Sequence, residues 1–253
     1  MNALSLLAFA IAPGICISIF IYIKDKHEHE PIGLLVKSFF YGMGSVVITL
    51  LISVPLSRFV AIDEQDLSQQ AVHAFIIVAL VEEFSKYVFV RGVLFRNPNF
   101  NEPFDGIVYS IMVGMGFATL ENIIYVAKGG WGVAVLRMFT AVPAHAAFAI
   151  LMGYYLGLAK FVHKKSLYSW YALGIATLLH GAYDYFWFIS FMPGLWVGAI
   201  ASLVIGIMLS KKAIKIHQDA SPFHPLAVGL NEPIGSEAAS EDKTPEPKDR
   251  YLK

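Results

Sequence analysis

Charge is scarce in this sequence. Only 15% of its 253 residues are Asp, Glu, Lys or Arg, and the formal net charge is zero. Soluble domains carry about 25% charged residues, whereas this chain is 57% hydrophobic and has a mean hydropathy of +0.60. The composition excludes an ordinary soluble domain and indicates an integral membrane protein whose partner is the lipid bilayer. Because no net positive charge is present to attract phosphates, we expect no nucleic-acid partner.

Cysteine and an N-terminal basic segment are also missing. The single cysteine, Cys16, excludes an intramolecular disulfide bond. No lysine or arginine precedes the first apolar run, so the sequence lacks the charged n-region of a secretory signal. We therefore expect this run to be retained as the first membrane helix.

Long apolar runs dominate instead. A spanning helix needs about 20 mostly apolar residues, and seven stretches predict an all-α fold, a polytopic integral membrane helix bundle with about seven transmembrane helices. Pro55 is expected to kink or end the second helix. Small residues such as Gly116 and Gly153 are expected to let neighbouring helices approach closely. The stretches are residues 4–23, 34–59, 71–93, 106–127, 133–161, 167–190 and 195–209, the last of them short.

The distribution of basic residues predicts the orientation. Cytoplasmic loops carry an excess of Lys and Arg, and one side of the predicted bundle holds ten of them while the other holds two. We therefore expect a cell-membrane protein with its N-terminus outside and its C-terminus in the cytoplasm. The ten are Lys24, Lys26, Arg91, Arg96, Lys160, Lys164, Lys165, Lys211, Lys212 and Lys215, and the two are Arg58 and Lys128.

The C-terminal part differs in composition from the rest. It has few apolar residues and many Pro, Glu, Ser and Lys residues, a mixture that cannot bury enough apolar surface to fold. The predicted organisation is a transmembrane bundle over residues 1–215 and a disordered cytoplasmic tail over residues 216–253.

Ionisable side chains interrupt four of the apolar stretches. A charged residue at the centre of a membrane helix costs about 2.5–3.5 kcal/mol on insertion scales, and it marks a functional site by default. Counted along the helices at about 1.5 Å per residue, five of these residues fall in one layer between the outer surface and the midplane. Scattered structural residues have no reason to agree in depth. The five are Glu82, Glu121, His145, His180 and Asp184.

Spacing adds pairs to this layer. Glu82 and Lys86 are four residues apart, as are His180 and Asp184, so each pair shares a helix face. Asp184 is expected to orient the ring of His180, and Lys86 to neutralise Glu82, while Glu83 points elsewhere. A carboxylate beside an imidazole suits activation of a water molecule and donation to a leaving amine. The pattern predicts hydrolysis of a peptide bond in or near the membrane.

Four motifs on separate predicted helices carry a resemblance to a known family. Glu82-Glu83-x-x-Lys86 is followed by Phe117-x-x-x-Glu121 with Asn122, by a lone His145 and by His180-x-x-x-Asp184. In this order they resemble the PrsW family of membrane proteases, which is related to the CAAX-type (Abi) intramembrane peptidases. The resemblance covers roughly residues 10–210. It implies a polytopic glutamic-type peptidase whose substrate is a membrane-anchored protein such as an anti-sigma factor, and it implies no particular oligomeric state. The catalytic candidates that it carries over are Glu82, Glu83, Glu121, His145, His180 and Asp184, with Lys86 and Asn122 in support.

The favoured mechanism uses no cofactor. Glu82 acts as general base, His145 and His180 surround the reacting carbonyl, Glu83 and Asp184 orient, and Glu121 is a second carboxylate of the site.

Three alternatives stay open beside it. A divalent metal such as zinc has ligands in His145, His180, Glu121 and Asp184, although the chain contains no His-Glu-x-x-His motif. Intramembrane Glu, His and Asp residues also serve proton-coupled transporters and non-catalytic scaffolds. At its plainest, Glu82 with Lys86 is a structural ion pair that fixes helix register.

Overall fold

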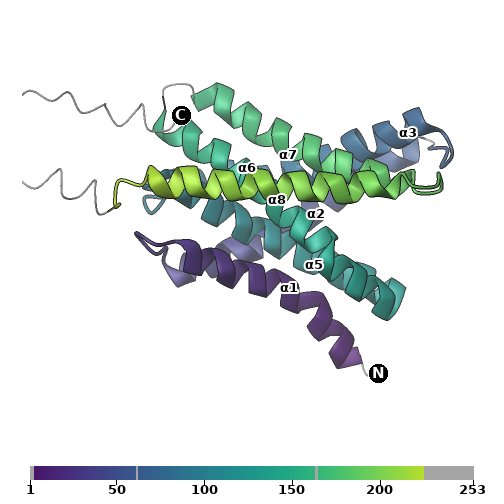
Figure 1. Ribbon diagram of the computed structural model, residues 1–253, viewed down its shortest axis with the longest axis horizontal. Helices are drawn as coiled ribbons and strands as arrows, with labels where there is room; N and C mark the ends of the chain where they lie inside the picture. The colour runs from purple at the N-terminus through teal and green to yellow at the C-terminus, as the bar shows by residue number, and fades with distance from the viewer. Residues whose placement is uncertain (1–2, 61, 163–164, 225–253) are drawn as a thin grey trace, which may run out of the picture.

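The fold is a bundle of helices that run roughly along one direction (Figure 1). The computed structural model describes residues 3–60, 62–162 and 165–224, and within these residues every secondary-structure element is helical. The predicted all-α class is therefore confirmed. The elements are α1 (Ala3–Lys24), α2 (Ile32–Phe59), α3 (Leu67–Val72), the π-helix η1 (His73–Leu80), α4 (Val81–Gly92), the 3-10 turn η2 (Leu94–Arg96), α5 (Pro103–Phe139), α6 (Ala141–Phe161), α7 (Lys165–Phe188) and α8 (Trp196–Asp219).

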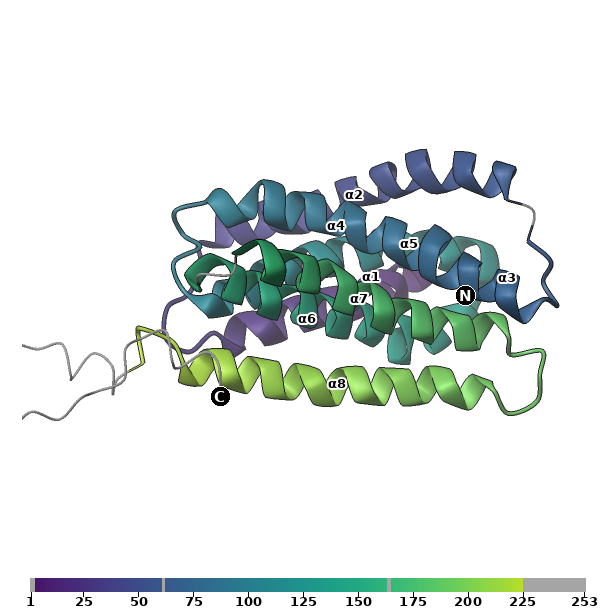
Figure 2. The same ribbon diagram turned by 90° about the horizontal axis from the view of Figure 1, so that it is seen from above.

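Helix α5 is the centre of the bundle. Its first half is almost wholly buried, and α1, α2 and α6 all pack against it. Helices α7 and η1 pack together beyond α6, and α8 covers α6 and α7. Figure 2 shows α2 and α8 at opposite edges, with the remaining helices between them. Side chains that point inward from α4, α5, α6 and α7 therefore meet in the interior.

Small residues permit the close helix crossings, as predicted. A Cβ atom built at Gly116 would overlap the carbonyl oxygen of Phe39 on α2, and one built at Gly153 would overlap the carbonyl oxygen of Gly106 on α5. Since lipid offers no hydrophobic drive between helices, such backbone contact supplies much of the packing.

Within the described residues, four helical stretches are long and apolar enough to cross a membrane. They are Leu4–Lys24, Ile32–Phe59, Pro103–Phe161 and Trp196–Asp219. The third contains both α5 and α6, and neither α7 nor the run from α3 to α4 is among the four. A membrane protein with several spanning helices is thus supported by length and composition, while the number seven stays a prediction.

Several predicted boundaries differ from the structure by a few residues. Helix α2 continues through Pro55 and ends at Phe59, the predicted last residue of its stretch, and the helical run that was predicted from residue 71 begins at Leu67. Helix α8, which was predicted to end at residue 209, continues to Asp219, so residues 216–219 of the predicted tail are helical. The rest of the predicted tail, residues 225–253, lies outside the described residues.

The join between the fourth and fifth predicted helices is also different. The sequence predicts a connection near residues 128–132. In the structure Gly130 takes a positive φ of 67° inside α5, and the helix resumes and ends only at Phe139. Thr140 then leaves helical geometry and α6 starts at Ala141. Residues 131–139 therefore belong to α5, which brings Arg137 within reach of the helix turns that precede the kink.

Candidate active site

Two neighbouring glutamates open helix α4 in the interior of the bundle. Glu82 is 7% exposed, Glu83 is fully buried and Lys86 is 3% exposed. The π-helix η1 ends at Leu80, directly before them. Such widened turns are rare and often lie at functional sites. Three ionisable side chains without access to water need partners within the protein.

Lys86 forms its shorter ion pair with Glu83. Its Nζ lies 2.7 Å from Glu83 Oε1 and 3.7 Å from Glu82 Oε2, and it lies 4.0 Å from the centre of the Phe117 ring, in cation–π contact. The predicted pairing of Lys86 with Glu82 is confirmed at 3.7 Å, whereas the shorter contact of Lys86 with Glu83 was not predicted. Glu82 Oε2 has no hydrogen-bond partner among the described residues.

His180 is held by carboxylates on both ring nitrogens. Its Nδ1 lies 2.8 Å from Glu83 Oε1, and its Nε2 lies 3.2 Å from Asp184 Oδ2 and 3.9 Å from Glu82 Oε2. The ring of Phe148 on α6 stacks against the imidazole at 4.8 Å. The predicted pairing of His180 with Asp184 is confirmed. The contact with Glu83, which joins α7 to α4, was not predicted.

His145 enters from α6 between a carboxylate and an ammonium group. Its Nε2 lies 3.0 Å from Glu121 Oε2 and its Nδ1 lies 3.3 Å from Lys86 Nζ. Because a lysine ammonium only donates hydrogen bonds, Nδ1 is the acceptor and a neutral ring carries its proton on Nε2. The rings of His145 and His180 are 5.1 Å apart at 87°. A donor N–H of His145 and a nitrogen of His180 therefore face the same small space.

Arg137 completes the site and was missed by the sequence analysis. Its guanidinium donates to Glu121 Oε2 at 2.7 Å and to Asn122 Oδ1 at 2.9 Å. Asn122 in turn donates to the carbonyl oxygen of Ala10 on α1 at 2.9 Å. The available signal was a charged residue inside an apolar run, which the sequence analysis interpreted as the start of a helix.

Two adjoining cavities meet at Glu82. The first has a volume of about 370 Å³ and is lined by both histidines, Asp184 and Arg137. The second, of about 420 Å³, lies beneath α2 and is lined mainly by apolar side chains. Glu82 and Glu121 line both cavities. One side of Glu82 thus faces the histidines and Asp184, and the other faces apolar side chains interspersed with hydroxyl groups and Lys128.

The structure brings all six catalytic candidates into one network. Every one of them lies within 4 Å of another candidate through the contacts given above. Lys86 sits at the centre of the network, and Asn122 lies at its edge, one contact away through Arg137. The chemical roles that the sequence analysis assigned to these residues stay predictions.

The donor atoms also fit a metal ion. One ligand atom each from Glu82, His145 and His180 lie within 4.8 Å of one another. Two histidines and a glutamate form a ligand set typical of catalytic zinc, and Glu83 at His180 Nδ1 provides the carboxylate that commonly orients a metal-binding histidine. The sequence had grouped Glu121 and Asp184 with the histidines, whereas the structure groups Glu82 with them. The predicted ligand roles of Glu121 and Asp184, whose carboxylate oxygens lie 3.0 Å from His145 Nε2 and 3.2 Å from His180 Nε2, stay predictions.

A second group of buried carboxylates lies where α1, α2 and α5 come together. Burial, together with the negative charges of Glu102 and Glu30, raises the pKa of Asp25 to about 7. Burial likewise raises the pKa of Glu102 to about 7. The Tyr109 hydroxyl donates a hydrogen bond to Glu30. The sequence showed the charges of this loop but not that they are buried.

Apolar helices around a cavity that holds carboxylates and imidazoles define a membrane protein with a buried acid–base centre. Comparison with known proteins then shows which family the chain belongs to. Residues 30–210 match the family described as PrsW family intramembrane metalloprotease, and the chain belongs to this family. This family consists of intramembrane proteases, and the match agrees with the family resemblance inferred from the four sequence motifs.

Curated relatives agree with this assignment. The chain is 38% identical over 167 residues to Protease PrsW of Geobacillus kaustophilus, which covers 66% of this chain and 72% of the relative. It is 32% identical over 166 residues to Protease PrsW of Bacillus subtilis, with 66% and 74% covered. No solved structure matches the chain significantly.

Proposed function

We propose that the protein is an endopeptidase that hydrolyses a peptide bond of a membrane-anchored protein, with its own Glu82 as the general base. The observation that carries this proposal is the state of Glu82 Oε2. It is buried, it lacks a hydrogen-bond partner, it lies 3.9 Å from His180 Nε2, and it faces both cavities. An unengaged carboxylate in this setting is suited to general-base work, because nothing else competes for its lone pairs.

Glu82 and the residues around it then have distinct chemical roles. Glu82 accepts a proton from water as the water attacks the scissile carbonyl, and it returns that proton to the leaving amine. His180, when protonated on Nε2, donates to the oxyanion, and His145, whose Nε2–H is engaged by Glu121, lines the space around the reacting carbonyl. Glu83 and Asp184 fix the ring of His180. Glu121, held by Arg137, orients His145 in the same way.

Substrate and topology follow from the surroundings of the site. The cavity beneath α2 is lined by Leu50, Val54 and Ile77 among others, so it fits the apolar span of a single-pass protein. An anti-sigma-factor-like protein is the proposed substrate class, by family resemblance. The proposed topology has about seven spans, the N-terminus outside and the C-terminus in the cytoplasm, which opens the polar cavity toward the outer side.

A metal-dependent mechanism is the second candidate, and the ligand set described above favours it. When bound by Glu82, His145 and His180, a zinc ion would supply Lewis-acid activation of a carbonyl or of water. Glu83 would hold the Nδ1–H of His180, and Nε2, which lies 3.2 Å from Asp184 Oδ2, would be the ligand atom. On His145, the proton that Nε2 shares with Glu121 would first have to leave, because Lys86 occupies Nδ1.

Cleavage by the purified protein in lipid tests the proposal. A panel of single-span membrane proteins is incubated with the wild type, with Glu82→Gln and with Ser85→Ala, with and without chelator. Ser85 is a matched control because it is buried on the same helix and its hydroxyl bonds only the carbonyl of Val81. The glutamate mechanism predicts that only Glu82→Gln loses cleavage and that chelator has no effect. Loss with chelator and recovery with zinc would instead establish the metal-dependent candidate, and full activity of Glu82→Gln would refute both.

A further inference from the structure

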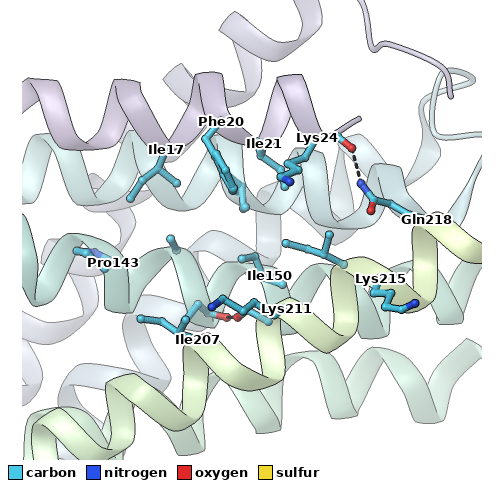
Figure 3. A pocket seen from close by; sticks show the side chains of 15 residues that line it. Ile17, Phe20, Ile21, Lys24, Pro143, Ile150, Ile207, Lys211, Lys215 and Gln218 are labelled. Atoms are coloured by element: carbon cyan, nitrogen blue, oxygen red, sulfur yellow. Dashed lines mark hydrogen bonds between the residues drawn. The ribbon is translucent and has the colours of Figure 1, made fainter. Parts of the chain in front are cut away.

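A large cavity lies apart from the candidate active site, between α1, α6 and α8 (Figure 3). Its volume is about 500 Å³, which is within the range of small-molecule sites. No residue that lines it also lines the two cavities at Glu82. Its occupant is therefore not the scissile segment of the substrate.

The walls of this cavity are apolar and open toward the outside of the bundle. Six isoleucines contributed by α1, α5, α6 and α8 line it, and small residues of α6 form part of the surface between them. Phe20 on α1 is 53% exposed and Ile207 on α8 is 36% exposed. In a bilayer, side chains exposed on the outer faces of α1 and α8 meet lipid. The isoleucines are Ile17, Ile21, Ile111, Ile150, Ile207 and Ile214.

Positive charge gathers at one end of the same cavity. Lys24 ends α1, and Lys211 and Lys215 lie on successive turns of α8 around it. Lys215 Nζ is 3.3 Å from Asp219 Oδ2 in an exposed ion pair, so Lys24 and Lys211 offer the unpaired charge. The side-chain amide of Gln218 donates to the backbone carbonyl of Lys24 and links α1 to α8 at this end (Figure 3). No aspartate or glutamate is among the described residues that line the cavity.

We propose that this cavity binds an anionic phospholipid, with an acyl chain against the isoleucines and the headgroup phosphate between Lys24 and Lys211. Charge complementarity selects this occupant, because basic pockets between membrane helices are suited to acidic headgroups. The long apolar wall selects a lipid rather than a free phosphate, which would leave that wall unfilled. A lipid in this position also joins α1 to α8, two helices that otherwise make few contacts with each other.

Lipid retention in native mass spectrometry tests the proposal. The full chain is placed in nanodiscs of equal phosphatidylglycerol and phosphatidylcholine, released, and its bound lipids are counted. One lysine near an anionic headgroup gives a preference of about fivefold, so the wild type should retain phosphatidylglycerol about twentyfold over phosphatidylcholine. Lys24→Gln with Lys211→Gln should abolish the preference. Lys212→Gln should keep it, because Lys212 is the next residue of α8 but lines a different cavity.

The apolar wall needs its own test. Ile207→Trp fills the cavity from α8 without changing charge, and it should reduce retention of both lipids about tenfold. Met208→Trp is the control, since Met208 is adjacent but lies outside the lining residues. The proposal is overturned if the wild type shows no preference, if Lys212→Gln loses as much as the double variant, or if Ile207→Trp behaves like Met208→Trp. Displacement of the lipid by millimolar inorganic phosphate would equally overturn it, in favour of a simple anion site.

Discussion

Replacement of Lys86 by methionine is expected to destabilise the folded bundle strongly. The change keeps the length of the side chain and removes its charge. Lys86 lies 2.7 Å from Glu83, is almost wholly buried, and contacts the ring of Phe117 at 4.0 Å. Removing one partner of a buried ion pair costs about 3–5 kcal/mol because the other charge is left uncompensated. The lost cation–π contact adds about 1 kcal/mol.

A second substitution should recover most of this loss. In Lys86→Met with Glu83→Gln both charges are gone, and a glutamine oxygen can still accept the hydrogen bond from His180 Nδ1. Replacing both partners of a buried pair with neutral groups is often near neutral in stability. The coupling energy of the cycle should therefore reach about 3–5 kcal/mol, the cost of the uncompensated charge that the second substitution removes.

Reversible unfolding in detergent measures all corners of this cycle. Lys37→Met, at an exposed position on α2, serves as the control and should change the unfolding free energy by less than about 0.5 kcal/mol. The reasoning fails if Lys86→Met is as mild as the control. It fails equally if the two substitutions at the site are additive, since Glu83 would then not be the partner that Lys86 compensates.

Three further predictions concern other parts of the fold. Arg137→Gln should reduce kcat about ten- to a hundredfold with little change in KM, because Glu121 loses the guanidinium that holds it; steady-state cleavage kinetics would show an unchanged kcat if Arg137 is only structural. Gly116→Ala should lower the unfolding free energy by at least about 2 kcal/mol, since the added methyl group would overlap the backbone of Phe39. An unfolding free energy within about 0.5 kcal/mol of the wild type would contradict the close crossing of α2 and α5. Asp25 has a raised pKa in the folded protein, so the unfolded chain releases its proton first as pH rises from about 4 to about 7, and the folded state loses stability across that window. Asp25→Asn should therefore gain about 1–2 kcal/mol relative to the wild type between pH 5 and pH 8, measured by thermal unfolding beside the exposed control Glu64→Gln; equal pH dependence in both proteins would show that Asp25 is not buried as described.

Patterns within one helix were predictable from sequence. The spacing of His180 and Asp184 places them on one face of α7, and the structure keeps that pair at 3.2 Å. The placement of Glu82, Glu121 and His145 within apolar runs was equally visible, because a charged or polar residue stands out in such a run. Such features depend on the helix period alone, so no tertiary contact has to be known.

Contacts between helices were not predictable in the same way. Whether Lys86 reaches Glu82 or Glu83 depends on how α4 is rotated against α7, where His180 takes one oxygen of Glu83. Arg137 was misplaced because the chain continues as helix past the kink at Gly130, and a glycine pair in a sequence predicts a break more readily than a kink. The burial of Asp25 depends on the start of α5, which is distant in the sequence from the loop between α1 and α2 that contains Asp25.

The central claim is that Glu82 is the reacting carboxylate while its neighbour Glu83 is held in structural contacts. Cleavage per folded molecule should be measured for Glu82→Gln and Glu83→Gln, together with their unfolding free energies. We expect Glu82→Gln to fold as well as the wild type and to lose about a thousandfold in kcat. Glu83→Gln should be destabilised, because Lys86 loses its closest partner, and should lose only about tenfold in kcat. A Glu82→Gln protein that cleaves within tenfold of the wild type, beside an inactive but stable Glu83→Gln, would contradict the account.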